Sequence, residues 1–420
     1  HDPSYKQQEG ARYSARDLAV YRGKLEGARV LLGSATPSLE SWQASELGRY
    51  QRLTMPARVG QGQLPTVRLV DMNLQPHRTV VAPALLEAMR RRLERGEQSL
   101  VFLNRRGYAP VLACTACEWK SDCPHCSAYR VFHRIDRTLR CHHCGFTERV
   151  PRACPSCGNL DIAPVGRGTE RVEEHLAELL ADARNVHGQP VRIARMDADT
   201  TRLKGSLESQ LAAVHAGAVD VLVGTQMITK GHDFRRITLV ASIQADAALF
   251  SSDFRASERL FSLLMQAAGR AGRETGTASP SEMWIQTAHP THALFAALKR
   301  HDFPAFARQQ LAERQQAGMP PFGYQALVRA EARTQEAAQA FLHTAAAAAP
   351  GTPGSEQVTL YPAVPMSLQR VANVERAQML VESPSRAALQ RFLTGWQEVL
   401  RSVRDKSVLR WAIDVDPLAV

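Results

Sequence analysis

The chain has 420 residues, of which 44% are hydrophobic, and it carries a formal net charge of +11. This length allows two or three domains with a sizeable core, and the excess of basic residues points to a polyanionic partner such as nucleic acid. No run of about 18 apolar residues occurs and the first ten residues lack the pattern of a signal peptide, so we predict no membrane span and no membrane partner.

Short apolar segments alternate with helical patterns along most of the chain. Between the apolar segments, residues 169–180 place Val172, Leu176, Leu179 and Leu180 on one helical face. This alternation predicts an α/β fold with a parallel sheet and helices on both faces. The predicted buried strands are 28–35, 99–103, 191–197, 219–225, 237–246 and 283–287.

All eight cysteines lie between positions 114 and 157, in four C-x-x-C pairs. Two such pairs supply the four thiolates of a tetrahedral zinc site, so eight cysteines predict two zinc ions. Fourteen residues separate Cys126 from Cys141, close to the spacing of a zinc ribbon, with a hairpin at 129–141 between the knuckles. This spacing favours a nested arrangement, with Cys123, Cys126, Cys141 and Cys144 inside and Cys114, Cys117, Cys154 and Cys157 outside.

Two alternatives to the nested zinc arrangement stay open. Sequential pairing, in which neighbouring C-x-x-C pairs share a zinc ion, is possible. Only five residues separate Cys117 from Cys123, so the loop between the first two pairs would be tight. Redox chemistry by the C-x-x-C pairs is the second alternative. Because eight thiolates saturate two sites, we do not expect the neighbouring histidines to be ligands: His125, His133, His142 and His143.

Polar motifs follow the predicted strands, and in an open parallel sheet ligands bind at the carboxyl ends of strands. The motifs are GSATPS (33–38), NRRGYAP (104–110) and GTQMITKGHDF (224–234), joined by QAAGRAGR (266–273) at the end of a helix that contains Leu260, Phe261, Leu263 and Leu264. In the last motif, Arg270 and Arg273 stand three apart among glycine and alanine. They suit a phosphate group, or alternatively the dipole at a helix C-terminus.

The order of these motifs resembles that of superfamily 2 helicases from their third motif onward, and in particular the bacterial primosomal replication-restart helicases of the PriA family. SYKQQEG (4–10), YSARDLAVYR (13–22), CPSCG (154–158) and ALFSSDFRASERLF (248–261) read like that family as well. The resemblance covers nearly the whole chain and implies a motor that unwinds forked DNA 3′ to 5′ with ATP and Mg²⁺ and promotes primosome assembly.

The resemblance also implies a domain organisation. Residues 1–60 would be the C-terminal remnant of a first RecA-like helicase lobe, and 61–113 with 158–305 a second RecA-like lobe. An inserted two-zinc module would span 114–157, and a small α+β domain 306–420. The sequence contains no G-x-x-x-x-G-K-[ST] phosphate loop, and His1-Asp2 looks like the end of the family's magnesium-binding motif. We therefore expect the C-terminal part of a longer protein, without ATPase activity by itself.

The resemblance further assigns roles to individual residues. Arg270 and Arg273 would be catalytic, reaching the β- and γ-phosphates of ATP, while Gln266, Gly231 and Asp233 would bind the nucleotide. DNA contacts would follow the logic of single-strand binding, with hydroxyls, amides and cations on phosphates and some aromatic stacking. The candidates are Asn104, Arg105, Arg167, Thr169, Thr225, Gln226 and Lys230, together with Tyr5 and Lys6 in residues 4–16, which are either a DNA-sensing loop or a plain surface loop.

The implied partners are forked and single-stranded DNA, primosome and helicase-loading proteins and single-strand-binding protein, in the bacterial cytoplasm at the nucleoid. Two other functional classes stay open. One is a restart scaffold without ATPase activity, against which the arginine motif argues. The other is a zinc-ribbon adaptor that binds nucleic acid or protein, which leaves GSATPS and GTQMITKGHDF unexplained.

Overall fold

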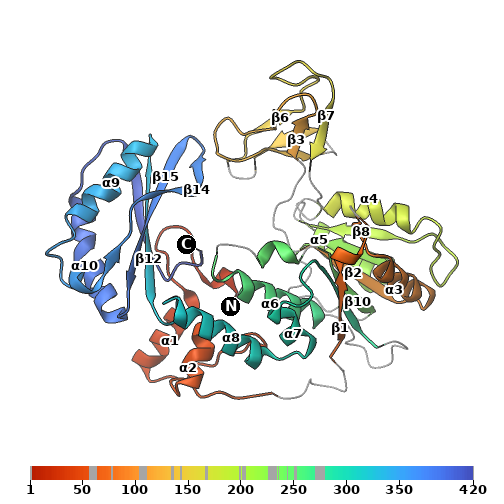
Figure 1. Ribbon diagram of the computed structural model, residues 1–420, viewed down its shortest axis with the longest axis horizontal. Coiled ribbons are helices and arrows are strands. Elements are labelled where there is room, and N and C mark those ends of the chain that lie inside the picture. The colour runs from red at the N-terminus through yellow and green to blue at the C-terminus, as the bar shows by residue number, and fades with distance from the viewer. Residues whose placement is uncertain are drawn as a thin grey trace. The chain divides into compact units, whose positions relative to one another are not determined.

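The computed structural model divides into two compact units, each described by itself below (Figure 1). The first consists of residues 44–109 and 166–310, and the second of 1–43, 110–165 and 311–420. The predicted domain boundaries stay a prediction. The structure describes residues 2–419 apart from 56–63, 77–78, 104–110, 134–136, 142–143, 166–168, 198–199, 201–204, 226–233, 235, 244, 250–252 and 270–279.

A six-stranded sheet forms the centre of the first unit, and every neighbouring pair of its strands is parallel. Its order is β1-β11-β10-β2-β9-β8, so the chain crosses over between most neighbours. The predicted α/β fold with a parallel sheet is confirmed. The strands are β1 (Thr66–Asp71), β2 (Gln98–Phe102), β8 (Ile193–Met196), β9 (Val221–Gly224), β10 (Ile237–Ser242) and β11 (Glu282–Thr287).

Five of the six predicted strands coincide with strands of this sheet, but the prediction for 28–35 is wrong. That segment has no strand conformation, and Leu31 is 83% exposed. A strand needs a neighbour that takes up its backbone hydrogen bonds, and none of the described segments pairs with residues 28–35. The sequence prediction also missed β1, an edge strand that is only partly buried.

Several helices of the first unit pack against this sheet. In α4 (Thr169–Leu179) and just after it, Val172, Leu176 and Leu180 are at most 2% exposed, as the spacing of apolar residues predicts. Each such side chain contributes roughly 1.5–3 kcal/mol through burial. The other helices are α3 (Pro83–Glu94), α5 (Ser206–His215), α6 (Ala256–Ala268), α7 (Ala293–Lys299) and α8 (Phe303–Gln316), the last of which crosses the boundary between the units.

A half-buried ion pair holds the loop that enters β8. The guanidinium of Arg192 donates to both carboxylate oxygens of Asp220, from Nε at 3.1 Å and from Nη2 at 3.0 Å. The backbone N–H of Arg192 donates to the same carboxylate at 2.8 Å. Partial burial raises the pKa of Asp220, but the hydrogen bonds and charge of Arg192 outweigh burial and hold that pKa below its usual value.

Residues 110–165, called the cysteine module below, form a small antiparallel sheet in the order β6-β5-β4-β3-β7. The predicted hairpin is present, because β4 pairs with β5 and Val131 lies opposite Arg140. The zinc-ribbon interpretation of residues 129–141 is therefore confirmed at the level of the backbone. The strands are β3 (Val111–Cys114), β4 (Val131–His133), β5 (Thr138–Arg140), β6 (Thr147–Arg149) and β7 (Ile162–Val165).

Residues 311–420, called the C-terminal domain below, contain a second antiparallel sheet, with β14 paired to β15 beside the order β13-β15-β12-β16. Two helices, α9 (Gln335–Ala347) and α10 (Arg386–Ser402), pack their apolar faces on it around the fully buried Trp396. The predicted α+β character is confirmed. The strands are β12 (Tyr324–Ala332), β13 (Thr359–Leu360), β14 (Val364–Val371), β15 (Val374–Ser383) and β16 (Val408–Val415).

The N-terminal segment contacts this second sheet through a buried lysine. Lys6 follows the short helix η1 (Pro3–Tyr5), and its ammonium lies 2.9 Å from a carboxylate oxygen of Asp414 in β16. The side chains of Lys6 and Asp414 are 5% and 2% exposed. The ammonium also donates hydrogen bonds to the backbone oxygens of Val415 and Arg12. The helices α1 (Ala15–Glu26) and α2 (Leu39–Glu46) follow.

Candidate functional site

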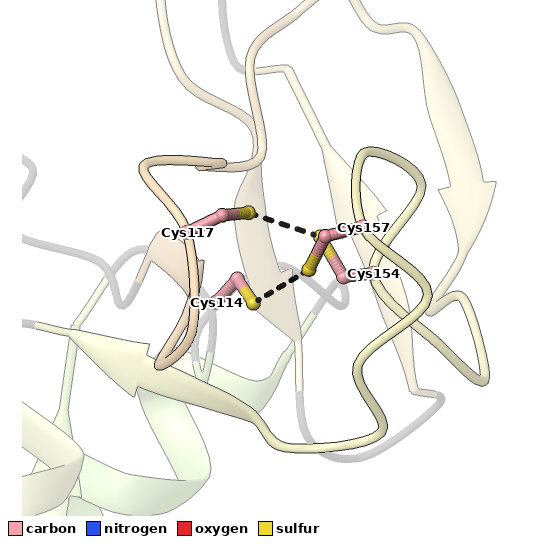
Figure 2. A group of neighbouring side chains, drawn as sticks. All are labelled: Cys114, Cys117, Cys154 and Cys157. Atoms are coloured by element: carbon pink, nitrogen blue, oxygen red, sulfur yellow. Dashed lines mark hydrogen bonds between the residues drawn. The ribbon is translucent and has the colours of Figure 1, made fainter.

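The outer cysteine group consists of Cys114, Cys117, Cys154 and Cys157. Cys114 ends β3, and the other three lie on loops of the cysteine module. Figure 2 shows the four side chains pointing toward one another, with Cys114 facing Cys157 and Cys117 facing Cys154. In both facing pairs the sulfur atoms lie 3.6 Å apart.

The inner cysteine group consists of Cys123, Cys126, Cys141 and Cys144. The sulfur atoms of Cys123 and Cys144 lie 3.7 Å apart, and the first three cysteines are at most 3% exposed. Ala128 and Phe146 pack around them and shield the group from water. The structure thus brings the eight cysteines together in the two groups of four that nesting requires.

Both groups have the size and chemistry of a zinc site. Within each group the sulfur atoms all lie within 4.8 Å of one another, and all eight cysteines are free thiols. A tetrahedron with Zn–S bonds of about 2.3 Å has edges of about 3.8 Å, close to the shorter distances observed. Each group could therefore hold one zinc ion with little rearrangement.

Hydrogen bonds lower the pKa of one thiol in the outer group. Burial raises the pKa of Cys114, but donation from the backbone N–H of Ala116 and from the side chain of Asn159 lowers it to about 6. In the inner group, burial and the neighbouring sulfur atoms raise the pKa of Cys126 to about 12. A divalent cation held by this group would displace the proton, because thiols ligate zinc as thiolates.

Asn159 is a residue that the sequence prediction missed. Its amide nitrogen lies 3.6 Å from the sulfur of Cys114 and 3.2 Å from the hydroxyl of Thr115, so it orients the first knuckle of the outer group. The available signal was its position two residues after Cys157, in CPSCGN. Such outer-sphere partners fix the geometry of metal ligands.

Two of the predicted DNA-binding motifs leave the parallel sheet at one place. In the register of β2 with β9, Phe102 lies beside Gly224, and the backbone N–H of Leu103 donates to the Gly224 oxygen at 2.9 Å. The NRRGYAP and GTQMITKGHDF motifs therefore start at the same edge of the sheet. Thr225 is half-buried there. The candidates Asn104, Arg105, Gln226, Lys230, Gly231 and Asp233 lie outside the described residues.

The helix α6 carries the predicted nucleotide-site motif at its C-terminal end. It is anchored by Phe261, which is fully buried and stacks on Phe306 with ring centroids 4.1 Å apart. Gln266 is half-buried in its last turn. Arg270 and Arg273 follow this turn and lie outside the described residues, so their roles stay predictions.

The remaining candidates differ in their surroundings. Tyr5 is 56% exposed, as a stacking residue needs to be. The ion pair with Asp414 favours a structural role for Lys6 over the predicted DNA contact. Thr169 begins α4, and Arg167 lies outside the described residues. None of the helices that the structure describes has the length and the apolar stretch needed to cross a bilayer.

Two family models match the chain in the regions just described. One, described as the PriA DNA helicase Cys-rich region (CRR) domain, matches residues 123–149. The other, described as the Primosomal protein N C-terminal domain, matches residues 315–418. Among solved structures, Mycobacterium smegmatis helicase Lhr bound to ssDNA and AMP-PNP is 15% identical over 58% of this chain and 22% of that one. Its TM-score of 0.30 is too low to carry an argument.

Curated relatives named Replication restart protein PriA match over larger stretches. The Haemophilus influenzae relative is 40% identical over 99% of this chain and 55% of its own length. The Bacillus subtilis relative is 41% identical over 78% of this chain and 40% of its own length. The chain thus spans about half the length of the curated relatives it matches. The cysteine-rich region, matched by the model of a PriA domain, and these relatives define the chain as part of a replication restart protein. Within that class, it belongs to the PriA family of replication restart proteins.

Proposed function

We propose that this chain contains the second motor lobe, the zinc module and the C-terminal domain of an ATP-dependent 3′–5′ DNA helicase that restarts replication. The observation that carries the proposal is the common origin of two polar motifs at the carboxyl ends of β2 and β9. Parallel strands place such motifs at one edge of the sheet, which is where α/β proteins bind their ligands. Family membership supplies the chemistry expected at that edge.

The proposed nucleotide site lies between this edge and a phosphate loop elsewhere in the full-length protein. Arg270 and Arg273 follow the well-anchored α6, and their guanidinium groups would stabilise negative charge that develops on the transferred phosphoryl group. Gln266, Gly231 and Asp233 would position the nucleotide. Mg²⁺ would accompany ATP and neutralise part of its charge.

Single-stranded DNA would cross the motifs that begin at Asn104 and Thr225. Cations such as Arg105 and Lys230 would neutralise DNA phosphates. Arg167 and Thr169 would contact the sugar-phosphate backbone of the DNA next to α4. The net charge of +11 favours such a path. Forked DNA would be the substrate, and primosome, helicase-loading and single-strand-binding proteins the partners, in the cytoplasm where the bacterial chromosome lies.

The two cysteine groups would each bind one structural zinc ion. All four positions of each tetrahedron are filled by sulfur, so no coordination site remains for substrate or water. The zinc ions would hold the loops of a module whose strands are only three or four residues long. Their role in the proposed helicase is thus to keep this module folded.

The proposed arginine role is tested in a full-length protein that carries this chain. Arg273→Ala should abolish DNA-stimulated ATP hydrolysis while leaving nucleotide and DNA affinity nearly unchanged, because the arginine acts mainly in the transition state. An arginine of this kind contributes roughly 10³–10⁵ in rate. Arg273→Lys should restore little activity, since an ammonium cannot reproduce the planar donor fork.

Steady-state ATPase rates measured beside equilibrium binding of a nucleotide analogue decide the matter. Wild-type turnover in the Arg273→Ala protein would overturn the assignment and favour a restart scaffold without an ATPase role. A parallel loss of nucleotide affinity and turnover would instead place Arg273 in ground-state binding.

A further inference from the structure

The turn between β14 and β15 contacts the inner cysteine group. Ala372 and Asn373 form this turn with positive φ angles of 50° and 62°, the backbone sign of the tight turns that suit two-residue hairpins. Asn tolerates the left-handed region, whereas Ala occupies it at a cost of roughly 1–2 kcal/mol. The pairing of Val371 with Val374 closes the two-residue hairpin and holds both residues at positive φ.

Ala372 contacts a cysteine of the inner group directly. Its backbone N–H donates to the sulfur of Cys126 at 3.3 Å, although the two residues are 246 positions apart in the sequence. Next to it, the backbone N–H of Asn373 donates to the oxygen of His125 at 2.9 Å. The side-chain amide nitrogen of Asn373 lies 3.0 Å from Nδ1 of His125, at hydrogen-bond distance.

A second set of contacts fixes the strand that leads into the turn. The backbone N–H of Ser127 donates to the oxygen of Arg370 at 2.9 Å, and the Arg370 N–H donates back to the Ser127 hydroxyl at 3.1 Å. Val371 packs against the inner cysteine group together with Phe146. The knuckle at 125–127 and the hairpin thus form a small interface with both polar and apolar contacts.

This interface continues into the core of the C-terminal domain. β14 pairs with β15, and β15 pairs with the central strand β12 over its whole length. The backbone hydrogen bonds of β14 with β15, and of β15 with β12, therefore connect the cysteine knuckle to the centre of the C-terminal sheet. Both partners belong to the same compact unit.

The charge of a four-thiolate zinc site explains what the Ala372 N–H contributes. Four thiolates around one Zn²⁺ leave a net charge of −2, and N–H donors to sulfur offset this charge in a buried site. The outer group has a donor within its own knuckle, from Ala116 to Cys114 at 3.3 Å. The inner group, which is the more buried of the two, takes one of its donors from the hairpin turn.

We propose that the β14–β15 turn is an outer-sphere part of the inner zinc site, so that zinc in this site holds the C-terminal domain to the cysteine module. Loss of that zinc would leave the knuckle at 125–127 without its metal anchor and release the hairpin that contacts it. The proposal rests on the two zinc sites proposed above, and concerns what one of them does beyond folding its own loops.

The first test measures zinc transfer from the purified chain to a colorimetric chelator. Ala372→Pro removes the N–H and the positive φ, whereas the matched control Ala372→Gly keeps the N–H and suits the turn. We expect Ala372→Pro to give up the inner zinc at about 10–100-fold lower chelator concentration, the usual effect of losing an outer-sphere partner. Alkylation of freed thiols and mass spectrometry identify the inner cysteines as the source, and the outer zinc serves as internal reference.

A second variant covers the case in which Ala372→Pro does not fold. Asn373→Gly keeps the turn conformation and removes only the side-chain contact with His125, so it should weaken inner-zinc retention by a smaller factor in the same direction. Equal chelator profiles for Asn373→Gly, Ala372→Gly and the parent would overturn the proposal.

The reciprocal test follows the hairpin by hydrogen exchange. Cys141→Ser, which damages the inner group, should raise amide exchange over residues 364–383, whereas Cys157→Ser in the outer group should leave it unchanged. Unchanged exchange in both variants would refute the coupling. A parent chain with fewer than two zinc ions would instead refute the zinc sites themselves, so the two failures are distinguishable.

Discussion

The buried ion pair between Lys6 and Asp414 permits a quantitative test of what Lys6 does. Breaking a buried pair by removing one partner costs roughly 3–5 kcal/mol, because the other charge is left uncompensated. Asp414 also lies 3.4 Å from a guanidinium nitrogen of Arg329. Lys6→Met therefore leaves Asp414 with a second cation, and we expect the lower end of that range, about 3 kcal/mol.

Asp414→Asn should cost more than Lys6→Met, about 5 kcal/mol. It leaves the buried Lys6 and the half-buried Arg329 without this countercharge, with side chains 5% and 16% exposed. Lys6→Met combined with Asp414→Asn should be less destabilised than the sum of the single variants, since removing both charges removes the desolvation penalty of the pair. Lys24→Met, at an exposed lysine of α1, is the matched control and should change stability little.

Urea unfolding measures these differences, followed by tryptophan fluorescence in a background in which Trp42, Trp119 and Trp284 are replaced by Phe, so that Trp396 and Trp411 of the C-terminal domain report. DNA affinity at several salt concentrations supplies the second readout, because removing a lysine that neutralises a phosphate lowers the magnitude of the salt slope by about 0.7 on single strands. We expect Lys6→Met to leave that slope unchanged. A Lys6→Met chain as stable as its parent, with a smaller slope, would refute the structural role and restore the DNA contact.

Three further predictions concern metal, DNA and pH. Elemental analysis should find two zinc ions per chain, and chelation should unfold the cysteine module while the parallel sheet keeps its circular dichroism; one zinc or none would contradict the paired groups. Arg105→Ala and Lys230→Ala should each reduce the salt slope of DNA binding by about 0.7–0.9, whereas affinity independent of salt would rule out phosphate contacts. Because the pKa of Asp220 is lowered by folding, its stabilisation is present above about pH 4 and is lost as pH falls through the folded-state pKa. Asp220→Asn should thus reduce the free energy of unfolding by about 1–3 kcal/mol at pH 7 and flatten its acid dependence, and an unchanged acid limb would show that Arg192 does not stabilise the carboxylate.

Sequence patterns succeeded where the structure depends on neighbours along the chain. The helix α4 was predictable because Val172 and Leu176 repeat at the helical period and both are buried. The cysteine groups were predictable because the two cysteines of each C-x-x-C pair are neighbours in the sequence. Only the choice of which two pairs combine depends on the long-range fold. Spacing favoured nesting, and the structure brings the sulfur atoms together in that order.

Patterns failed where a distant partner decides the outcome. The segment 28–35 is as apolar as a true strand, but strand formation depends on a neighbour, and no described segment supplies one. β1 was missed because its exposed Arg68 interrupts the apolar run, although that arginine pairs with Glu282 on the adjacent strand. The donor from Ala372 to Cys126 could not be foreseen, since nothing in a hairpin sequence reveals which surface its turn will meet.

The nesting of the two cysteine groups has a consequence for the order in which metal enters. Thirty-six residues separate Cys117 from Cys154. Once zinc has closed the inner group, residues 123–144 form one fixed knot of chain. The flexible residues between Cys117 and Cys154 are then only 118–122 and 145–153. The loop that the outer group must close is then less than half as long. Each halving lowers the entropic cost of closure by about 0.6 kcal/mol, which corresponds to an affinity about threefold higher for the second ion. Assembly of this module is thus expected to run from the centre outward, with singly loaded chains carrying their zinc in the inner group.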